Sequence, residues 1–174
     1  VIGSRNSRDT YRIREFLSRN QVPMRWLDVD TDSGAAELLR HFGVGDEALP
    51  VVVCTGQPVL RNPSTRDLAQ AVGLKRAIGS EVYDLVSVGA GPAGLAAAVY
   101  GSSEGLTTLL LDADSPGGQA GASNAIENYL GFPMGITGAD LTRAATLQAQ
   151  KFGARLSTPA PVTALEDEGS HLTV

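Results

Sequence analysis

The stretch from Tyr83 to Asp112 constrains the fold of this chain more than any other part. An apolar run over residues 85–88 leads into the sequence Gly-Ala-Gly-Pro-Ala-Gly over residues 89–94, which is followed by an alanine-rich segment, a second apolar run and an acid. A dinucleotide-binding βαβ unit requires this order of strand, glycine turn, helix, strand and acid. The sequence therefore predicts an α/β, Rossmann-like fold for this part of the chain.

The residues of the glycine turn, residues 89–94, have distinct roles in such a unit. Gly89 allows the tight turn, Gly91 lets the backbone approach a pyrophosphate, and Gly94 lets the helix pack closely on the strand. Pro92 and Ala93 would lie in the first helical turn, where free N–H groups bind anions and the missing proline N–H is not needed. We expect these residues to bind the pyrophosphate of a dinucleotide.

Asp112 follows the second apolar run, roughly 20 residues beyond Gly94, a spacing from which a carboxylate can accept hydrogen bonds from an adenosine ribose. The next residues, Ala113 and Asp114, include no arginine that could meet a 2′-phosphate. The residues thus favour FAD or NAD over NADP, and spacing does not choose between the first two.

The composition of the chain bears on whether nucleic acid or a membrane is a partner. The chain has 174 residues, of which 43% are hydrophobic and 19% charged, and its net charge is −5. An acidic chain of this kind does not favour a nucleic-acid partner. The sequence has no apolar run near the roughly 20 residues that a membrane span requires, so we expect no membrane segment and a cytoplasmic location. Because strand-like residues stand at both Val1 and Val174, we expect the chain to be a fragment of a longer protein.

Metal and thiol chemistry have few candidates. Cys54 is the single cysteine, so no disulfide can close within the chain, and its place after an apolar run favours a buried thiol over a reactive one. His41 and His171 are isolated, and neither has neighbours at metal-ligand spacing. We predict no metal site and assign no catalytic residue.

The first 75 residues alternate between strand and helix patterns, with helices expected over residues 8–20, 34–41 and 64–73 and strands over residues 1–3, 24–29, 51–55 and 58–60. This order resembles the thioredoxin and glutaredoxin fold, in which Pro50 would be the cis-proline. The redox members carry C-x-x-C where this chain has Ser7-Arg8-Asp9-Thr10. A hydroxyl cannot replace a thiolate in disulfide exchange, so we expect this domain to be inactive in redox chemistry, with Ser7 and Thr10 as helix caps.

Two further motifs follow Asp112, namely Gly-Gly-Gln over residues 117–119 and Glu-Asn-Tyr-Leu-Gly over residues 127–131. Together with the glycine turn they resemble the thioredoxin-reductase-like FAD flavoproteins, over residues 83–174. The resemblance implies that the amides of Gln119 and Asn128 bind the flavin and its ribityl chain. It also implies that Gly118 lets the backbone approach the ring system and that backbone near Val162 meets the adenine. The alternative for the two amides is ordinary loop capping.

The remaining elements follow the same pattern. A helix is expected from Thr137 to about Phe152, with a buried stripe formed by Leu141, Ala144, Ala145 and Leu147. A further parallel strand is expected over residues 155–157, and the first strands of a β-meander over residues 162–165 and 171–174.

The predicted organisation is a thioredoxin/glutaredoxin-like domain over residues 1–75, a linker over residues 76–82, and an incomplete FAD-binding domain over residues 83–174. The resemblance implies a homodimeric FAD-dependent oxidoreductase that passes reducing equivalents from NADPH or NADH through flavin to an unknown acceptor, which a small redox protein could be. Two alternatives stay open: a non-catalytic nucleotide-binding or redox-sensing module, and a ferredoxin–NADP reductase of the thioredoxin-reductase type.

Overall fold

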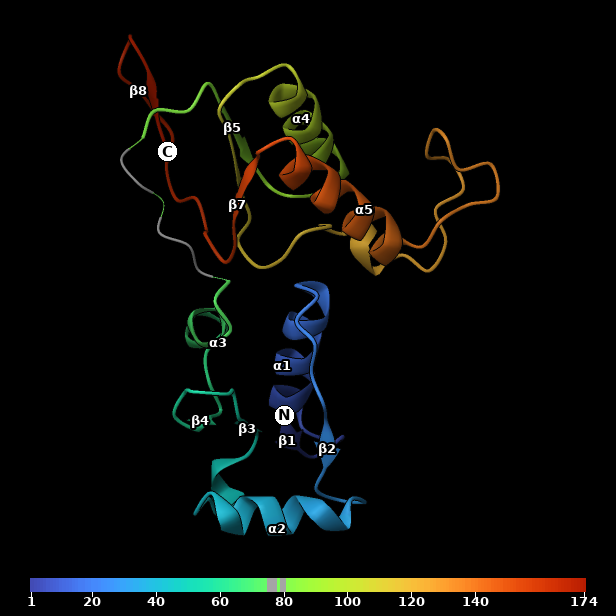
Figure 1. The fold of residues 1–174 in the computed structure, drawn as a ribbon, viewed down its shortest axis with the longest axis vertical. Helices are drawn as coiled ribbons and strands as arrows, with labels where there is room; N and C mark the ends of the chain where they lie inside the picture. Colours follow the sequence, from blue (N-terminus) through green and yellow to red (C-terminus); the bar gives the residue numbers. More distant parts are fainter. Residues whose placement is uncertain (75–77, 79–80) are drawn as a thin grey trace. The chain divides into compact units, whose positions relative to one another are not determined.

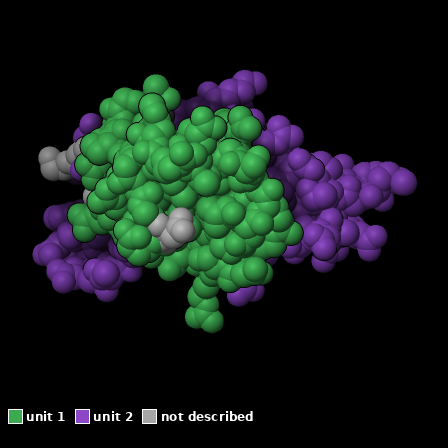
Figure 2. Space-filling view, turned by 90° about the horizontal axis from the view of Figure 1, so that it is seen from below, with its two compact units in different colours: residues 1–74 green, residues 75–174 purple. Residues whose placement is uncertain are grey.

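The computed structural model describes residues 1–74, 78 and 81–174 of the chain, traced in Figure 1. The chain forms two compact units, Val1–Leu74 and Lys75–Val174, coloured green and purple in Figure 2. We call them unit 1 and unit 2 and treat each by itself. Of the predicted linker, residues 76, 77, 79 and 80 lie outside the described residues.

Unit 1 contains a four-stranded sheet with the strand order β2-β1-β3-β4. Strands β1 and β2 are parallel, whereas β1 with β3 and β3 with β4 are antiparallel. The strands are β1 (Ile2–Gly3), β2 (Leu27–Asp28), β3 (Val51–Val52) and β4 (Leu60–Arg61). The strand predicted over residues 24–29 is therefore shorter than expected, and the Leu49–Pro50 peptide bond before β3 is cis.

Helices cover both faces of this sheet because neighbouring strand residues point to opposite sides. Val51 packs in a cluster with Ala35 and Leu39, while Val52 packs in another with Ile13 and Leu68. The helices are α1 (Arg8–Arg19), α2 (Ser33–His41), η1 (Asp46–Ala48) and α3 (Thr65–Ala71), shown in Figure 1. One face is thus covered by α2 and the other by α1 and α3.

Not every residue predicted to cap a helix in unit 1 does so in the structure. Ser7 and Ser64 each accept a hydrogen bond from the backbone N–H three residues later, as N-cap residues do. Thr10 is not a cap, so that prediction was wrong. Its side chain is 1% exposed, and its Oγ1 has no partner among the described residues. Thr10 points inward because it lies on the same face of α1 as the buried Ile13 and Leu17.

Unit 2 is built around a parallel sheet in the order β5-β6-β7, which confirms the predicted Rossmann-like α/β fold. Two helices connect its strands, and Leu95 and Ala98 of the first pack in one core with Leu110 of the sheet and Ala149 of the second. The elements are β5 (Leu85–Val88), α4 (Pro92–Ser103), β6 (Thr108–Leu111), η2 (Ala120–Ala122), α5 (Gly138–Lys151), β7 (Arg155–Ser157), β8 (Glu166–Asp167) and β9 (Leu172–Thr173).

Two details of unit 2 differ from expectation. In α5, Leu141 and Ala149 are buried and Ala145 is half-buried, but Ala144 is exposed and Leu147 is 54% exposed. The buried stripe follows a spacing of four residues, and this spacing turns Leu147 away from the sheet. The antiparallel pair β8 and β9 begins later than predicted, so residues 162–165 precede the first strand of the pair. Over the described residues, no helix has the length and apolar character needed to cross a membrane.

Candidate dinucleotide site

The glycine turn connects β5 to α4. Gly89, directly after β5, has a φ of +96°, a left-handed conformation that glycine adopts without steric cost. Gly91 is the N-cap of α4, and Pro92 occupies the first helical turn. Of the five α-helices in the described residues, α4 alone begins without an N-cap side chain that accepts a hydrogen bond from a backbone N–H. Its first-turn N–H groups and the positive end of its dipole can therefore serve an anion.

The space around each of the other glycines shows what a side chain there would meet. A Cβ on Gly94 would overlap the carbonyl oxygen of Gly89 and lie 2.9 Å from Ser87 Oγ, so only glycine lets α4 start this close to β5. A Cβ on Gly91 would meet nothing within 4 Å. A Cβ on Gly118 would lie 3.3 Å from the Cα of Gly91. The glycine turn thus lies close to the loop over residues 115–119, which we call the second glycine loop. Open space that a Cβ at Gly91 would enter lies beside the start of α4. This arrangement fits a pyrophosphate.

Asp112, half-buried at the end of β6, has partners that the sequence did not predict. Its Oδ2 accepts a hydrogen bond from the Ala90 N–H at 2.7 Å. Its Oδ1 accepts hydrogen bonds from the N–H groups of Asp114 at 3.0 Å and Ser115 at 2.9 Å. The carboxylate therefore joins the glycine turn to the segment after β6.

The loop over residues 115–119 is held against the glycine turn. The Gly117 N–H donates to the Ala90 carbonyl oxygen at 2.7 Å. Gly117 has a φ of +105°, and a Cβ there would lie 2.6 Å from Thr142 Oγ1. Ser115 is 1% exposed. Sequence reasoning missed Ala90 and Thr142, because an alanine inside the turn and a threonine on α5 carry no local signal of contact with this loop.

The remaining predicted ligands lie on exposed or partly exposed segments. Gln119 and Asn128 are exposed, and no hydrogen bond of their side-chain amides is found among the described residues. Asn128 belongs to the long loop that projects between η2 and α5 in Figure 1. Val162 is half-buried between β7 and β8. Gly118 lies close to the glycine turn. Among the described residues, no hydrogen bond joins Gln119, Asn128 or Val162 to the glycine turn.

The shifted pKa values in unit 2 belong to groups outside the glycine turn. Hydrogen bonds from the Thr107 hydroxyl and N–H lower the pKa of Asp84, and the Thr137 hydroxyl lowers that of Asp140. Tyr83 and the Glu81 carboxylate raise the pKa of Arg155. Within the described residues, no group of three or more His, Cys, Asp and Glu side chains could hold a metal ion.

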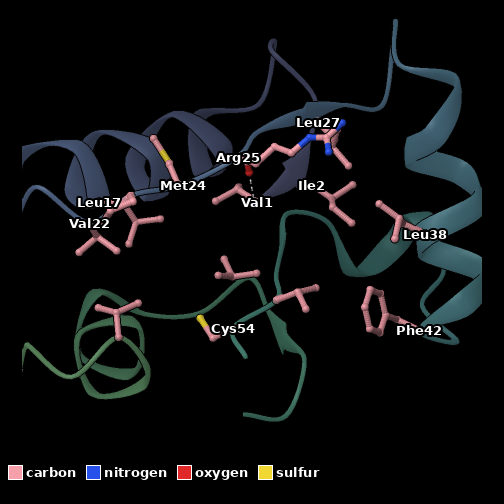
Figure 3. A pocket seen from close by; sticks show the side chains of 14 residues that line it. Val1, Ile2, Leu17, Val22, Met24, Arg25, Leu27, Leu38, Phe42 and Cys54 are labelled. Carbon is pink, nitrogen blue, oxygen red and sulfur yellow. Dashed lines mark hydrogen bonds between the residues drawn. The ribbon is translucent and has the colours of Figure 1, made fainter. Parts of the chain in front are cut away.

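Unit 1 carries a pocket of about 320 Å³, shown in Figure 3. Its walls are mainly apolar and include Leu17, Leu27 and Phe42, and the half-buried Cys54 lies at its edge. The amino group of Val1 donates to the Arg25 carbonyl oxygen at 2.8 Å beside it. This pocket belongs to unit 1, whereas the glycine turn and the start of α4 belong to unit 2.

Comparison with known proteins finds thioredoxin reductases among both the curated relatives and the solved structures. No protein-family model matches the chain. The thioredoxin reductase of Bacillus subtilis (strain 168) is 45% identical over 74 residues, which are 42% of this chain and 23% of that protein. The thioredoxin reductase of Ureaplasma parvum serovar 3 is 54% identical over 52 residues, 30% of this chain and 17% of that protein.

Among solved structures, thioredoxin reductase from Lactococcus lactis matches with 36% identity and a TM-score of 0.49, over 52% of this chain and 29% of that chain. The chain thus spans less than a third of the length of each of these relatives. The sequence identities confirm the resemblance predicted from the glycine turn and the Gly-Gly-Gln motif: part of this chain is similar to the thioredoxin reductases, FAD-dependent members of the pyridine nucleotide-disulfide oxidoreductase family.

Proposed function

We propose that the protein containing this chain is an FAD-dependent oxidoreductase of the thioredoxin-reductase type, which passes reducing equivalents from a pyridine nucleotide through flavin to an acceptor. The observation that carries the proposal is the close approach of Gly118 to Gly91, where a Cβ on Gly118 would lie 3.3 Å from the Gly91 Cα, beside the uncapped start of α4. The named relatives are reductases, which favours an enzyme over a sensing module.

The cofactor residues are those predicted from the sequence. Gly89, Gly91 and Gly94, with Pro92 and Ala93, would hold the pyrophosphate at the start of α4. Gly118, Gln119 and Asn128 would meet the flavin side of the cofactor, and backbone near Val162 the adenine. Asp112 would also accept a hydrogen bond from the ribose. FAD, when bound, supplies the hydride and electron-transfer chemistry, while the protein binds and orients it.

We propose that unit 1 is a thioredoxin/glutaredoxin-like domain that acts in docking or regulation. Its strand order, with one parallel and two antiparallel pairs, and its helices on both faces support this assignment. The chain has a single cysteine, so unit 1 contains no dithiol for disulfide exchange. Ser7 occupies the start of α1 as a helix cap.

Several finer features of the whole protein are proposals from the same resemblance. NADPH or NADH would be the electron donor, and a small redox protein the acceptor. A homodimer and a cytoplasmic location complete the proposal. A ferredoxin–NADP reductase of the same type, which needs no redox-active cysteine pair, is the enzyme alternative, and tests with different acceptors separate the two.

The experiment that tests the proposal is a flavin absorbance spectrum of the full-length protein, followed by anaerobic addition of NADPH and of NADH. Bleaching of a bound flavin by one nucleotide is the expected result, and it would identify the donor. A bound flavin that neither nucleotide reduces would support the sensing module, and a protein without flavin would contradict the cofactor assignment. Reduction of thioredoxin compared with ferredoxin then separates the two enzyme alternatives.

A further inference from the structure

Asp112 joins the carboxyl ends of three neighbouring strands. Its N–H donates to the Ser157 carbonyl oxygen of β7 at 3.2 Å, and its own carbonyl oxygen accepts from Ala160 N–H at 2.7 Å. Its side chain reaches in the other direction, to Ala90 directly beyond β5. Every polar group of this residue is therefore used in holding the edge of the sheet where the glycine turn lies.

Ala90 connects Asp112 to the second glycine loop through its two backbone hydrogen bonds. It is fully buried, and both of its backbone groups are bonded. The N–H donates to Asp112 Oδ2, and the carbonyl oxygen accepts from the Gly117 N–H. One residue of the glycine turn thus connects to the segment after β6 twice, once through the carboxylate and once through the second glycine loop.

The capacity of the carboxylate limits what else it can do. An ionised carboxylate has about four acceptor positions. Three are occupied by the N–H groups of Ala90, Asp114 and Ser115. Hydrogen bonds to a charged acceptor are stronger than neutral ones, and a buried donor left without a partner is costly. Most of the hydrogen-bonding capacity of the Asp112 side chain is therefore used by backbone N–H groups of the protein itself.

We propose that Asp112 is a positioning residue whose carboxylate holds the glycine turn and the second glycine loop in their binding geometry before any cofactor arrives. This inference rests on the proposed FAD site, and it adds a role distinct from contact with the ribose. A preformed site binds its ligand more tightly because the loops lose no further conformational entropy when the ligand binds. The fourth acceptor position leaves room for a ribose hydroxyl, so the two roles can coexist.

The test uses the Asp112→Asn variant of this chain, with Asp84→Asn as the matched control. An asparagine has one acceptor oxygen and cannot serve all three N–H groups. Asp84 also accepts a backbone N–H and a hydroxyl bond, both from Thr107, but at the opposite end of the β5–β6 pair. Hydrogen exchange of the Ala90, Asp114 and Ser115 amides is measured by NMR without cofactor. One oxygen cannot serve both sides of the carboxylate, so we expect at least one of these amides to exchange about tenfold or more faster in Asp112→Asn, and all three to be unchanged in Asp84→Asn.

Unchanged exchange of all three amides in a folded Asp112→Asn variant would overturn the proposal. If that variant does not fold, the wild-type chain decides: a scalar coupling across the hydrogen bond from the Ala90 nitrogen to the Asp112 carboxyl carbon supports the proposal, and its absence contradicts it. Neither measurement needs a cofactor. A failure of the proposed function, seen as a wild-type protein that binds neither ADP nor FAD, is thereby distinguished from a failure of this inference.

A second measurement separates positioning from ribose contact. ADP, 2′-deoxy-ADP and 3′-deoxy-ADP are titrated into the wild-type and Asp112→Asn chains. If Asp112 acts on the loops, the substitution lowers the affinity for all three nucleotides, including those that lack one ribose hydroxyl. A loss that disappears when one hydroxyl is missing would show that the residue acts by binding the ribose, and would overturn the positioning role.

Discussion

Gly94 lies so close to Gly89 that any side chain at position 94 would overlap the Gly89 carbonyl oxygen. The atom that would be overlapped is a backbone carbonyl oxygen, which cannot move away by side-chain rotation. The start of α4 and the end of β5 are held together by β5–β6 pairing and by the buried Leu95. The close approach is therefore set by the packing of α4 against β5 and β6.

The Gly94→Ala variant should destabilise unit 2 by about 1–3 kcal/mol, the usual cost of forcing extra volume into a packed site. Gly121→Ala is the matched control, because its Cβ would make only ordinary contacts, with Thr142 Oγ1 at 3.5 Å and the Pro116 carbonyl oxygen at 3.7 Å. Urea unfolding of both variants measures the difference. Equal stability of the two would contradict the steric role of Gly94.

Substitution of Gly91 should separate stability from cofactor binding. Its Cβ would enter open space, and its backbone conformation (φ −71°, ψ −179°) suits any residue. Gly91→Ser would add the kind of N-cap that begins other helices, so stability should be kept or slightly raised. Gly91→Val should abolish flavin binding, because its side chain enters the pyrophosphate path, and Gly91→Ser should weaken it. Flavin content of the purified full-length protein is the measurement, and unchanged content in Gly91→Val would defeat the site assignment.

Two threonine substitutions on one helix give a matched pair for the start of α5. Thr137 Oγ1 accepts from the Asp140 N–H at 3.1 Å, and loss of such a cap costs about 0.5–2 kcal/mol. Thr146 Oγ1 is buried without a partner among the described residues, so Thr146→Ala should be neutral or stabilising. Urea unfolding should therefore place Thr137→Ala below wild type and Thr146→Ala at or above it. The reverse order would count against the assigned cap.

Thr107→Val should raise the pKa of Asp84 towards its ordinary value, because it removes the hydroxyl that donates to Asp84 Oδ2 at 2.6 Å. In the wild type the folded-state pKa is lower than the unfolded one. The bond therefore stabilises the fold above the unfolded pKa, and this contribution is lost as pH falls through the folded pKa. Carboxyl NMR titration of both proteins checks the shift, with the Asp140 carboxyl as an internal reference that should not change. A pKa of Asp84 that stays the same in Thr107→Val would refute the cause.

Local hydrogen bonds were readable from the sequence. Ser7, Ser64 and Thr137 cap their helices through N–H groups three residues away, and a short polar residue before an apolar helical pattern predicts this interaction. The βαβ order with its glycine turn was readable for a similar reason, because a parallel pair of strands joined by a helix has few arrangements. Thr10 was misassigned because which face of α1 is buried depends on a sheet that lies elsewhere in the sequence.

The amino-acid sequence by itself determined the α/β fold of unit 2, the starts of most helices and the family resemblance, because these depend on neighbours within a few residues or on a motif in order. The tertiary structure alone decided which side chains meet. Ala90 and Asp112 are 22 residues apart in sequence, and Gly118 reaches Gly91 only after α4 and β6 have packed. Contacts of this range are set by the packing of whole elements, and for that reason the inward role of the Asp112 carboxylate became visible only in three dimensions.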